Sequence, residues 1–281
     1  MSIDVAAAAQ LACLLEATAP KPGNVSPGQH FRDTRFEDFL ASAAAIGLPF
    51  ADAGEQPLGL TIRKAVEATA QWTGSNTNLG MVLLLAPVAR AALVYRRPDL
   101  RGAVRDVLEA TTWEDARHTY AAIRLASPGG LGRVPAEDVA HEPNVTLLEA
   151  MELAVNRDGI AREYVTGYET TFMVGVPALR AARRANLSWD AAVVETFLTL
   201  LSARPDTHII RRGGERMANA VSRRATDVLA AGGVRSEDGR RALAEMDAFL
   251  RSDDNIANPG TSADLTAAAI FVFLLSGGWR P

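Results

Sequence analysis

Apolar residues recur at helical spacing along almost the whole chain, and this pattern restricts the folds that the sequence can adopt. In the stretch FEDFLASAAA, Phe36, Phe39 and Ala43 follow one another at intervals of three and four residues, which puts them on one face of an α-helix. No stretch shows a convincing alternation of polar and apolar residues, the pattern of a half-buried strand. The sequence therefore predicts an all-α fold.

Helices are expected over most of the chain, separated by polar loops. The predicted helical ranges are 3–18, 33–50, 57–72, 78–95, 99–109, 113–126, 146–165, 170–185, 188–203, 215–231, 237–251 and 262–275. Asp33 or Thr34 is expected to cap the second of these helices. The longest irregular segment, 126–144, is expected to be a mobile lid or a long crossover. Because we find no low-complexity linker and no fixed repeat, we expect residues 1–281 to form a single domain.

The composition narrows the class of partner and the compartment. With 48% hydrophobic residues in 281, the chain has enough apolar side chains for a well-filled core. A formal net charge of -4 gives no basic footprint, so we expect no nucleic-acid partner. The longest apolar runs start at Leu79 and Leu265 and are shorter than the roughly 20 residues that cross a bilayer, so we expect no membrane span. The single Cys13 and the lack of a secretory leader predict a cytoplasmic protein.

Four polar loops are the expected places for chemistry, because buried helix faces are occupied by packing. Their sequences are KPGNVSPGQHFRDT, TGSNTNLG, RPDTHIIRRGG and NIANPGTSADL. In the first loop, Lys21 can meet a phosphate and Asp33 can ligate a hard cation such as Mg²⁺. The plain alternative is an ordinary loop in which Asp33 only caps the next helix.

The second and fourth loops each lead into a strongly apolar helix. Free backbone amides at a helix start, together with the positive end of the helix dipole, bind anions. The same residue types are also ordinary helix caps, so either loop alone is a weak signal. The residues concerned are Asn76, Thr77 and Asn78 in the second loop, and Gly260, Thr261, Ser262 and Asp264 in the fourth.

The third loop gathers a carboxylate, an imidazole and two guanidinium groups within two helical turns. Such a set can hold a metal ion and a polyphosphate, or it can be a solvated helix end. Its members are Asp206, Thr207, His208, Arg211, Arg212 and Gly213.

Carboxylates on the predicted helix 146–165 are further candidates. Glu149 and Glu152 are three residues apart and share a helix face, and Asp158 and Glu163 lie farther on. Paired carboxylates that face inward can ligate a metal or act as acid and base. Surface carboxylates at this spacing are far commoner, and Arg157 can neutralise one of them locally.

The stretches EATAPKPGNV, GSNTNLG, PDTHIIRRGG and NPGTSADL together resemble, in order and spacing, the triphosphoribosyl-dephospho-coenzyme A synthase family over residues 16 to 275. The resemblance implies an all-helical, Mg²⁺-dependent transferase that moves the ribose triphosphate of ATP onto dephospho-coenzyme A and releases adenine. ATP and Mg²⁺ are the implied cofactors, small molecules are the implied partners, and a homodimer is one possible assembly.

The resemblance also implies roles for individual residues. Asp206 and Asp264, with Asp33, would hold Mg²⁺, and Lys21, Arg211 and Arg212 would supply positive charge to the triphosphate. Glu163 or Glu149 is favoured as the general base over Asp206, which also remains a candidate. The other residues expected to bind the nucleotide are Asn24, Asn76, Thr77, Asn78, Thr207, His208, Gly213, Gly260 and Ser262.

One departure from the family pattern bears on the acceptor. The second motif usually continues with histidine and lysine, whereas this chain has Asn78 and Leu79. A lost lysine–phosphate contact costs roughly 1.5–3 kcal/mol, and Arg63, Lys64 and Arg162 are the substitutes that the sequence offers.

The stretches DTRFEDFLAS, NTNLGMVLLLAP and EAMELAVNRDGIA resemble a divergent branch of the same family that is linked to the biosynthesis of tetrahydromethanopterin or methanofuran. We therefore expect low or absent activity with dephospho-coenzyme A. The alternatives are a kinase or ligase in one-carbon carrier biosynthesis, a hydrolase of phosphoribosyl compounds, or a nucleotide-binding protein without catalysis.

Overall fold

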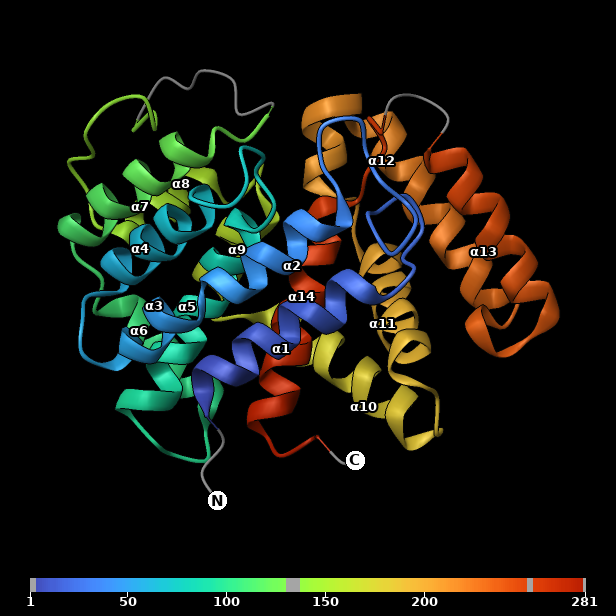
Figure 1. Ribbon diagram of the computed structural model, residues 1–281, viewed down its shortest axis with the longest axis horizontal. Helices are drawn as coiled ribbons and strands as arrows, with labels where there is room; N and C mark the ends of the chain where they lie inside the picture. The colour runs from blue at the N-terminus through green and yellow to red at the C-terminus, as the bar shows by residue number, and fades with distance from the viewer. Residues whose placement is uncertain (1–3, 130–136, 252–254, 280–281) are drawn as a thin grey trace.

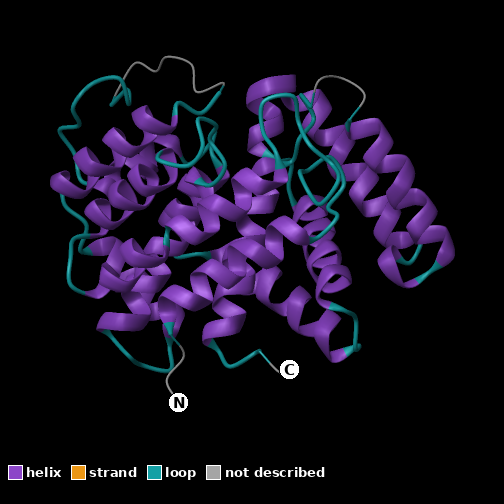
Figure 2. Cartoon of the chain, in the orientation of Figure 1, coloured by secondary structure: helices purple, strands orange, loops and turns teal. Residues whose placement is uncertain are grey.

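The computed structural model describes residues 4–129, 137–251 and 255–279, and within these ranges the regular structure is helical, with no strand (Figure 2). The predicted all-α fold is confirmed. The longer helices are α1 Val5–Thr18, α2 Phe36–Ala45, α4 Leu58–Ala70, α5 Leu79–Val94, α6 Leu100–Glu109, α7 Trp113–Ala126, α8 Leu147–Ala154, α9 Gly159–Thr166, α10 Val176–Arg184, α11 Trp189–Ala203, α12 Thr207–Ala230, α13 Glu237–Leu250 and α14 Gly260–Leu275. Short helical turns complete the fold, namely α3 Gly47–Ala51, η1 Asp52–Gly54, η2 Thr171–Gly175 and η3 Gly233–Arg235.

The two most apolar helices, α5 and α14, pack against each other. In Figure 1, α14 lies in the centre, α5 lies on the same side as α4, α7 and α8, and α11, α12 and α13 lie on the other side. Helix α14 packs against α1, α5 and α11. Every helix from α1 to α14 contributes buried residues to one hydrophobic core. That core agrees with the expected single domain, which stays a prediction.

Three predicted helix boundaries differ from the structure. The predicted helix 146–165 is split into α8 and α9, because the Asp158 carboxylate accepts the N–H of Ile160 at 2.8 Å and so caps a new helix. Helix α12 begins at Thr207 and not at 215, although it is kinked at Gly214, where φ is 81°. Neither Asp33 nor Thr34 caps α2; the cap is Arg35, whose N–H donates to the Asp38 carboxylate at 2.8 Å.

The segment predicted as a lid or crossover lies partly outside the described residues. Its part after residue 136 follows α7. The Tyr120 hydroxyl donates to the carbonyl of Glu137 at 2.8 Å, and Arg124 donates to the carbonyl of Val139 at 2.8 Å. These contacts hold that part of the segment on the α7 surface. None of the helices in the described part of the chain is long and apolar enough to cross a membrane.

Candidate active site

One cleft of about 920 Å³ collects residues from all four polar loops. This volume is in the upper part of the usual range for sites that bind small molecules. The loop residues that line it include Asn24 and Asp33, Gly74 to Asn78, His208, Arg211 and Arg212, and Asn258, Gly260, Thr261 and Asp264. The walls are completed by α5, α7, α8 and α9. Segments far apart in the sequence therefore meet at one place.

Asp206 joins two of the helices that form the cleft. One carboxylate oxygen accepts the N–H groups of His208 at 2.8 Å and Ile209 at 3.2 Å, at the start of α12. The other oxygen accepts from Ser262 in the first turn of α14, from its N–H at 2.7 Å and its hydroxyl at 2.8 Å. Asp206 is only 2% exposed and does not line the cleft. These contacts favour a cap shared by two helices over the expected roles in metal binding and catalysis.

Thr207 ties a third helix to the same junction. Its hydroxyl accepts the N–H of Gly159 at 3.0 Å, and it lies 3.0 Å from the hydroxyl of Thr261. The starts of α9, α12 and α14 therefore meet beside the cleft. Thr207 and Ser262, expected to bind nucleotide, hold these helices together and lie behind the lining residues.

Lys21 is fully buried and does not reach the cleft. Its ammonium group lies 2.9 Å from the carboxylate of Glu16 and donates to the carbonyl of Ala19 at 3.3 Å. Burial raises the pKa of the Glu16 carboxyl, and the charge of Lys21 opposes this rise. The expected phosphate contact of Lys21 is therefore replaced by an internal ion pair that shapes the first loop.

The two favoured general bases lie away from the lining residues. Glu163 is fully buried, and its oxygens accept the N–H groups of Thr170 at 2.9 Å and Thr171 at 2.8 Å. Glu149 is bound to the start of α8, where it accepts the N–H of Thr146 at 2.8 Å. Hydrogen bonds from Thr146 lower the pKa of Glu149. Both carboxylates accept backbone N–H groups at helix starts, so the geometry favours another residue as the general base.

Residues of the second loop line the cleft and also fix the start of α5. Asn76 accepts the N–H of Leu79 at 3.2 Å through its side-chain oxygen. The Thr77 hydroxyl bonds to the Ser42 hydroxyl, and Asn78 donates to the hydroxyl of Thr69 at 3.0 Å. In the first loop, Asn24 donates to the side-chain oxygen of Asn258 at 2.8 Å. Gly213 precedes the kink of α12 and is not among the lining residues.

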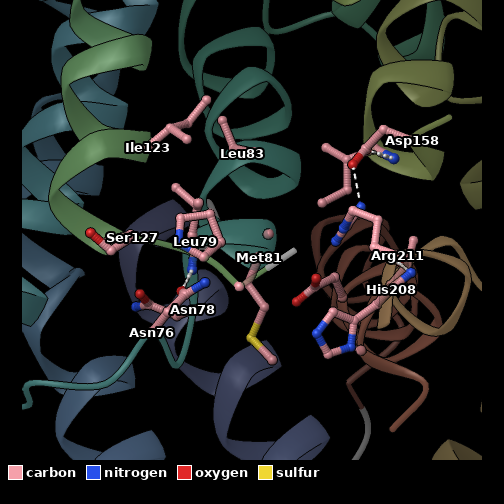
Figure 3. Close-up of a pocket in the computed structure, with 18 of the residues that line it drawn as sticks. Asn76, Asn78, Leu79, Met81, Leu83, Ile123, Ser127, Asp158, His208 and Arg211 are labelled. Carbon is pink, nitrogen blue, oxygen red and sulfur yellow. Dashed lines mark hydrogen bonds and ion pairs between the residues drawn. The ribbon is translucent and has the colours of Figure 1, made fainter. Parts of the chain in front are cut away.

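Three arginines line the cleft, namely Arg157, Arg211 and Arg212. Figure 3 shows Arg211 on the side of Asp158 and His208. Arg211 forms an ion pair with Asp158 at 2.7 Å, and its Nε atom is buried without a hydrogen-bond partner. Arg157 and Arg212 are exposed, and neither forms an ion pair with another described residue. This side of the cleft is therefore suited to an anionic ligand.

His208 presents a neutral imidazole with a fixed orientation. Its Nδ1 atom lies 3.0 Å from the carbonyl oxygen of Asn258, and because a carbonyl only accepts, Nδ1 carries the hydrogen. The Nε2 atom is then left as the acceptor. Burial is the main cause that lowers the pKa of His208, and the charges of Arg211 and Arg212 lower it further. Asp206 and the bond to Asn258 oppose this effect.

Asp264 is a carboxylate without a hydrogen bond or ion pair to any residue in the described ranges. It lies against the first turn of α5, where a Cβ atom at Gly80 would be 1.9 Å from its Oδ2 atom. Burial, followed by the charges of Glu16 and Asp206, raises the pKa of Asp264 well above its usual value. No cluster of three or more His, Cys, Asp or Glu groups able to hold a metal occurs in the described residues. Asp33, Asp206 and Asp264 therefore do not form the expected three-carboxylate site.

The whole chain matches the family described as ATP:dephospho-CoA triphosphoribosyl transferase, over residues 2–281. The chain belongs to this family. A relative from Malonomonas rubra, named "Probable 2-(5''-triphosphoribosyl)-3'-dephosphocoenzyme-A synthase", is 27% identical over 98% of this chain and 89% of that protein. The synthase of that name from Klebsiella pneumoniae is 32% identical over 119 residues, which are 42% of either chain. The match spans less than half of that relative.

A solved structure from Archaeoglobus fulgidus, provisionally named a triphosphoribosyl-dephospho-CoA synthase, is 30% identical. The alignment has a TM-score of 0.66 and covers 86% of this chain and all of the other. The resemblance inferred from the four loop motifs is thus confirmed, and with it the assignment to a family of enzymes.

Compared with the usual motif of this transferase family, the chain lacks a cation after Thr77. The substitutes expected from the sequence do not line the cleft, since Arg63 pairs with Glu67 at 2.7 Å and Lys64 donates to Gln56 at 2.7 Å. Arg162 is also absent from the lining residues.

Arg157, expected only as a local partner of a carboxylate, lines the cleft, as does Asp158, which was one of the carboxylates considered on this segment. Asn258 was not singled out in the sequence. The signal for Arg157 and Asp158 was the stretch NRDG, in which an aspartate that starts a helix directly follows an arginine.

Proposed function

We propose that this chain transfers the triphosphoribosyl group of ATP to a hydroxyl of dephospho-CoA and releases adenine. The observation that carries the proposal is the cleft in which Arg157, Arg211 and Arg212 accompany a free carboxylate and a neutral imidazole. A family of transferases that use ATP, with relatives named for the same product, supports this reaction over the alternatives.

In this reaction, the bond between the anomeric carbon of the ATP ribose and the adenine nitrogen breaks. A bond forms between that carbon and the acceptor oxygen, the hydroxyl proton passes to a base, and adenine leaves with a proton. Positive charge develops on the sugar in the transition state, as in glycosyl transfer. The protein must therefore hold the triphosphate, orient the sugar and move protons.

The triphosphate is assigned to the side of the cleft that carries the arginines. Arg157 and Arg212 are free to form charge-assisted hydrogen bonds with phosphate oxygens. Arg211 has an unpaired buried Nε–H that can donate in addition to its bond with Asp158.

Mg²⁺ fits this cleft as the partner of bound ATP. Asp264 would hold it, because its carboxylate is unpaired and its raised pKa reflects burial and nearby negative charge with too little compensating positive charge. Mg²⁺ is commonly held by one or two carboxylates together with substrate phosphates and water, so a cluster of three carboxylates is not required. When bound, it would neutralise part of the triphosphate charge.

His208 is assigned as the base for the acceptor hydroxyl. Its Nε2 atom is an acceptor because Nδ1 donates to Asn258, and its lowered pKa keeps the ring neutral at pH 7. The bond to Asn258 also fixes the plane of the ring. As the proposed base, His208 replaces Glu163 and Glu149, whose carboxylates accept backbone N–H groups away from the cleft.

The acceptor is assigned as dephospho-CoA in spite of the departure at Asn78 and Leu79. Low activity with dephospho-CoA was expected because a phosphate-binding lysine is missing. Arg157 lines the cleft and supplies a cation in place of that lysine, so we assign full activity. A role in one-carbon carrier biosynthesis rests on the sequence resemblance to the divergent branch alone.

The direct test is mass spectrometry after incubation of the protein with ATP, Mg²⁺ and dephospho-CoA. The expected products are free adenine and an acceptor that is heavier by one triphosphoribosyl group. ADP or free phosphate would indicate a kinase or ligase, and consumption of ATP without an acceptor would indicate a hydrolase. Bound but unconsumed ATP would indicate a binding protein, and a product only with pterin or furan precursors would identify another acceptor.

A further inference from the structure

The wall of the cleft formed by α7 and α8 is apolar and open. Leu125 on α7 is 49% exposed and Leu153 on α8 is 56% exposed, yet both line the cleft. Ile123 and Met151 extend the same wall. Large apolar side chains that stay exposed beside a binding site commonly contact a ligand.

The α7–α8 wall itself carries no charged side chain. The residues of α7 and α8 that line the cleft are all uncharged, namely Tyr120, Ile123, Leu125, Ala126, Ala150, Met151, Leu153 and Ala154. At this end, Tyr120 donates to the carbonyl of Glu137, and the side chains of Glu137 and Asp138 also border the cleft. In Figure 3, Ile123 and Leu83 lie on the opposite side of the cleft from Arg211 and His208.

The wall is continuous with the charged side along α8. Leu153 and Ala154 lie in the last turn of that helix, and Arg157 follows within one turn's length of chain. A ligand that lies along α8 therefore passes from a cation to apolar side chains. Dephospho-CoA has this distribution of groups, with a long uncharged pantetheine arm and a charged diphosphate that would lie beside Arg157 together with the triphosphate of the donor.

We propose that the α7–α8 wall binds the pantetheine arm of the acceptor and thereby selects acceptors that carry such an arm. The inference rests on the proposed transferase function for its choice of ligand. The arm has amide groups and methyl groups but no charge, which matches an uncharged wall of leucine, isoleucine and methionine. The donor ATP has no such arm, and its uncharged group is the compact adenine ring, so an effect of the wall on the KM for dephospho-CoA alone identifies the arm as its ligand.

The first experiment compares the variants Leu125→Ser and Leu153→Ser with the wild type. Both side chains are half exposed, so their replacement removes ligand contact with little effect on the core. Each variant is expected to raise the KM for dephospho-CoA about fivefold, as the loss of part of a leucine contact predicts, and to leave the KM for ATP within about twofold. The matched control is Leu48→Ser, because Leu48 is 75% exposed and does not line the cleft.

The second experiment needs no turnover and uses pantetheine itself as the probe. Ligand-observed NMR is expected to show saturation transfer to the arm with the wild type and with Leu48→Ser, and a weaker signal with Leu153→Ser. If ATP is consumed by another reaction but pantetheine still binds in this pattern, the proposed function fails and the wall assignment stands. Equal signals from Leu48→Ser and Leu153→Ser, or an unchanged KM for dephospho-CoA in both wall variants, would overturn the assignment.

Discussion

At the scale of single residues, Asp264 is the group whose surroundings differ most from those of an ordinary surface carboxylate. We expect Asp264→Asn to remove the gain in ATP affinity that Mg²⁺ provides, about tenfold, because the cation loses a cleft carboxylate that has no hydrogen bond or ion pair within the described residues. Affinity without Mg²⁺ should stay the same or rise, since a negative charge near the triphosphate is removed. Calorimetry with and without Mg²⁺ measures both quantities, and an equal Mg²⁺ effect in the variant and the wild type would exclude Asp264 as the ligand.

His208 leads to a prediction about pH. Its pKa lies below the ordinary 6.5, so the ring is neutral at pH 7 and gains a proton only as the pH falls below that value. We expect kcat/KM to be flat above pH 6.5 and to decrease at lower pH. Asp206, Arg211 and Arg212 are the charged groups whose interactions with the ring set its pKa.

His208→Gln should lower kcat roughly 100-fold or more and abolish the acidic limb. Gln keeps a polar side chain but accepts no proton. An acidic limb that persists in the variant would assign that titration to another group.

The sequence identified the loops that supply the cleft but not the task of each residue. His208, Arg212 and Asp264 come from these loops and line the cleft. Asp206 has the same sequence context as these residues, yet its second oxygen is taken by Ser262, 56 positions away in the chain. A contact that forms only on folding decides between a ligand-binding carboxylate and a structural one.

At the scale of the helices, Asp206 is expected to matter for stability. Asp206→Ala removes bonds at the starts of both α12 and α14, and we expect it to lower the free energy of unfolding by about 3 kcal/mol. Asp4→Ala is the matched control, because Asp4 caps only α1 and is exposed; it should cost about 1 kcal/mol. Urea unfolding of the two variants tests the difference, and equal losses would show that the link between the helices adds nothing.

Helix positions were largely predictable because the apolar period and the caps are local signals. The break between α8 and α9 was missed, although Asp158 and Gly159 are a recognisable cap and first residue. The apolar residues before and after these two positions continue at helical spacing, and this pattern led to the prediction of one helix over 146–165. The kink of α12 at Gly214 explains why a helix start was expected at 215.

At the scale of the whole molecule, the cleft exists only because α7, α8, α9 and the first turn of α5 lie beside the starts of α12 and α14. The residues of these helices are separated by up to roughly two hundred positions, and no local pattern encodes which helices become neighbours. The resemblance of the four loops to a known family predicted that they act together, which the helical periodicity alone did not. A homodimer and a cytoplasmic location stay predictions of the sequence.

Because the cleft lies between these two sets of helices, a ligand there links them and should stabilise the fold. With ATP and Mg²⁺ at about 100 times Kd, the expected gain is about 2.7 kcal/mol, or a rise in Tm of about 5 °C for a chain of this size. The double variant Arg157→Ala/Arg212→Ala should keep the Tm of the free protein, since both side chains are exposed, and should lose most of the rise. Differential scanning calorimetry measures both, and a full rise in the double variant would place the triphosphate elsewhere.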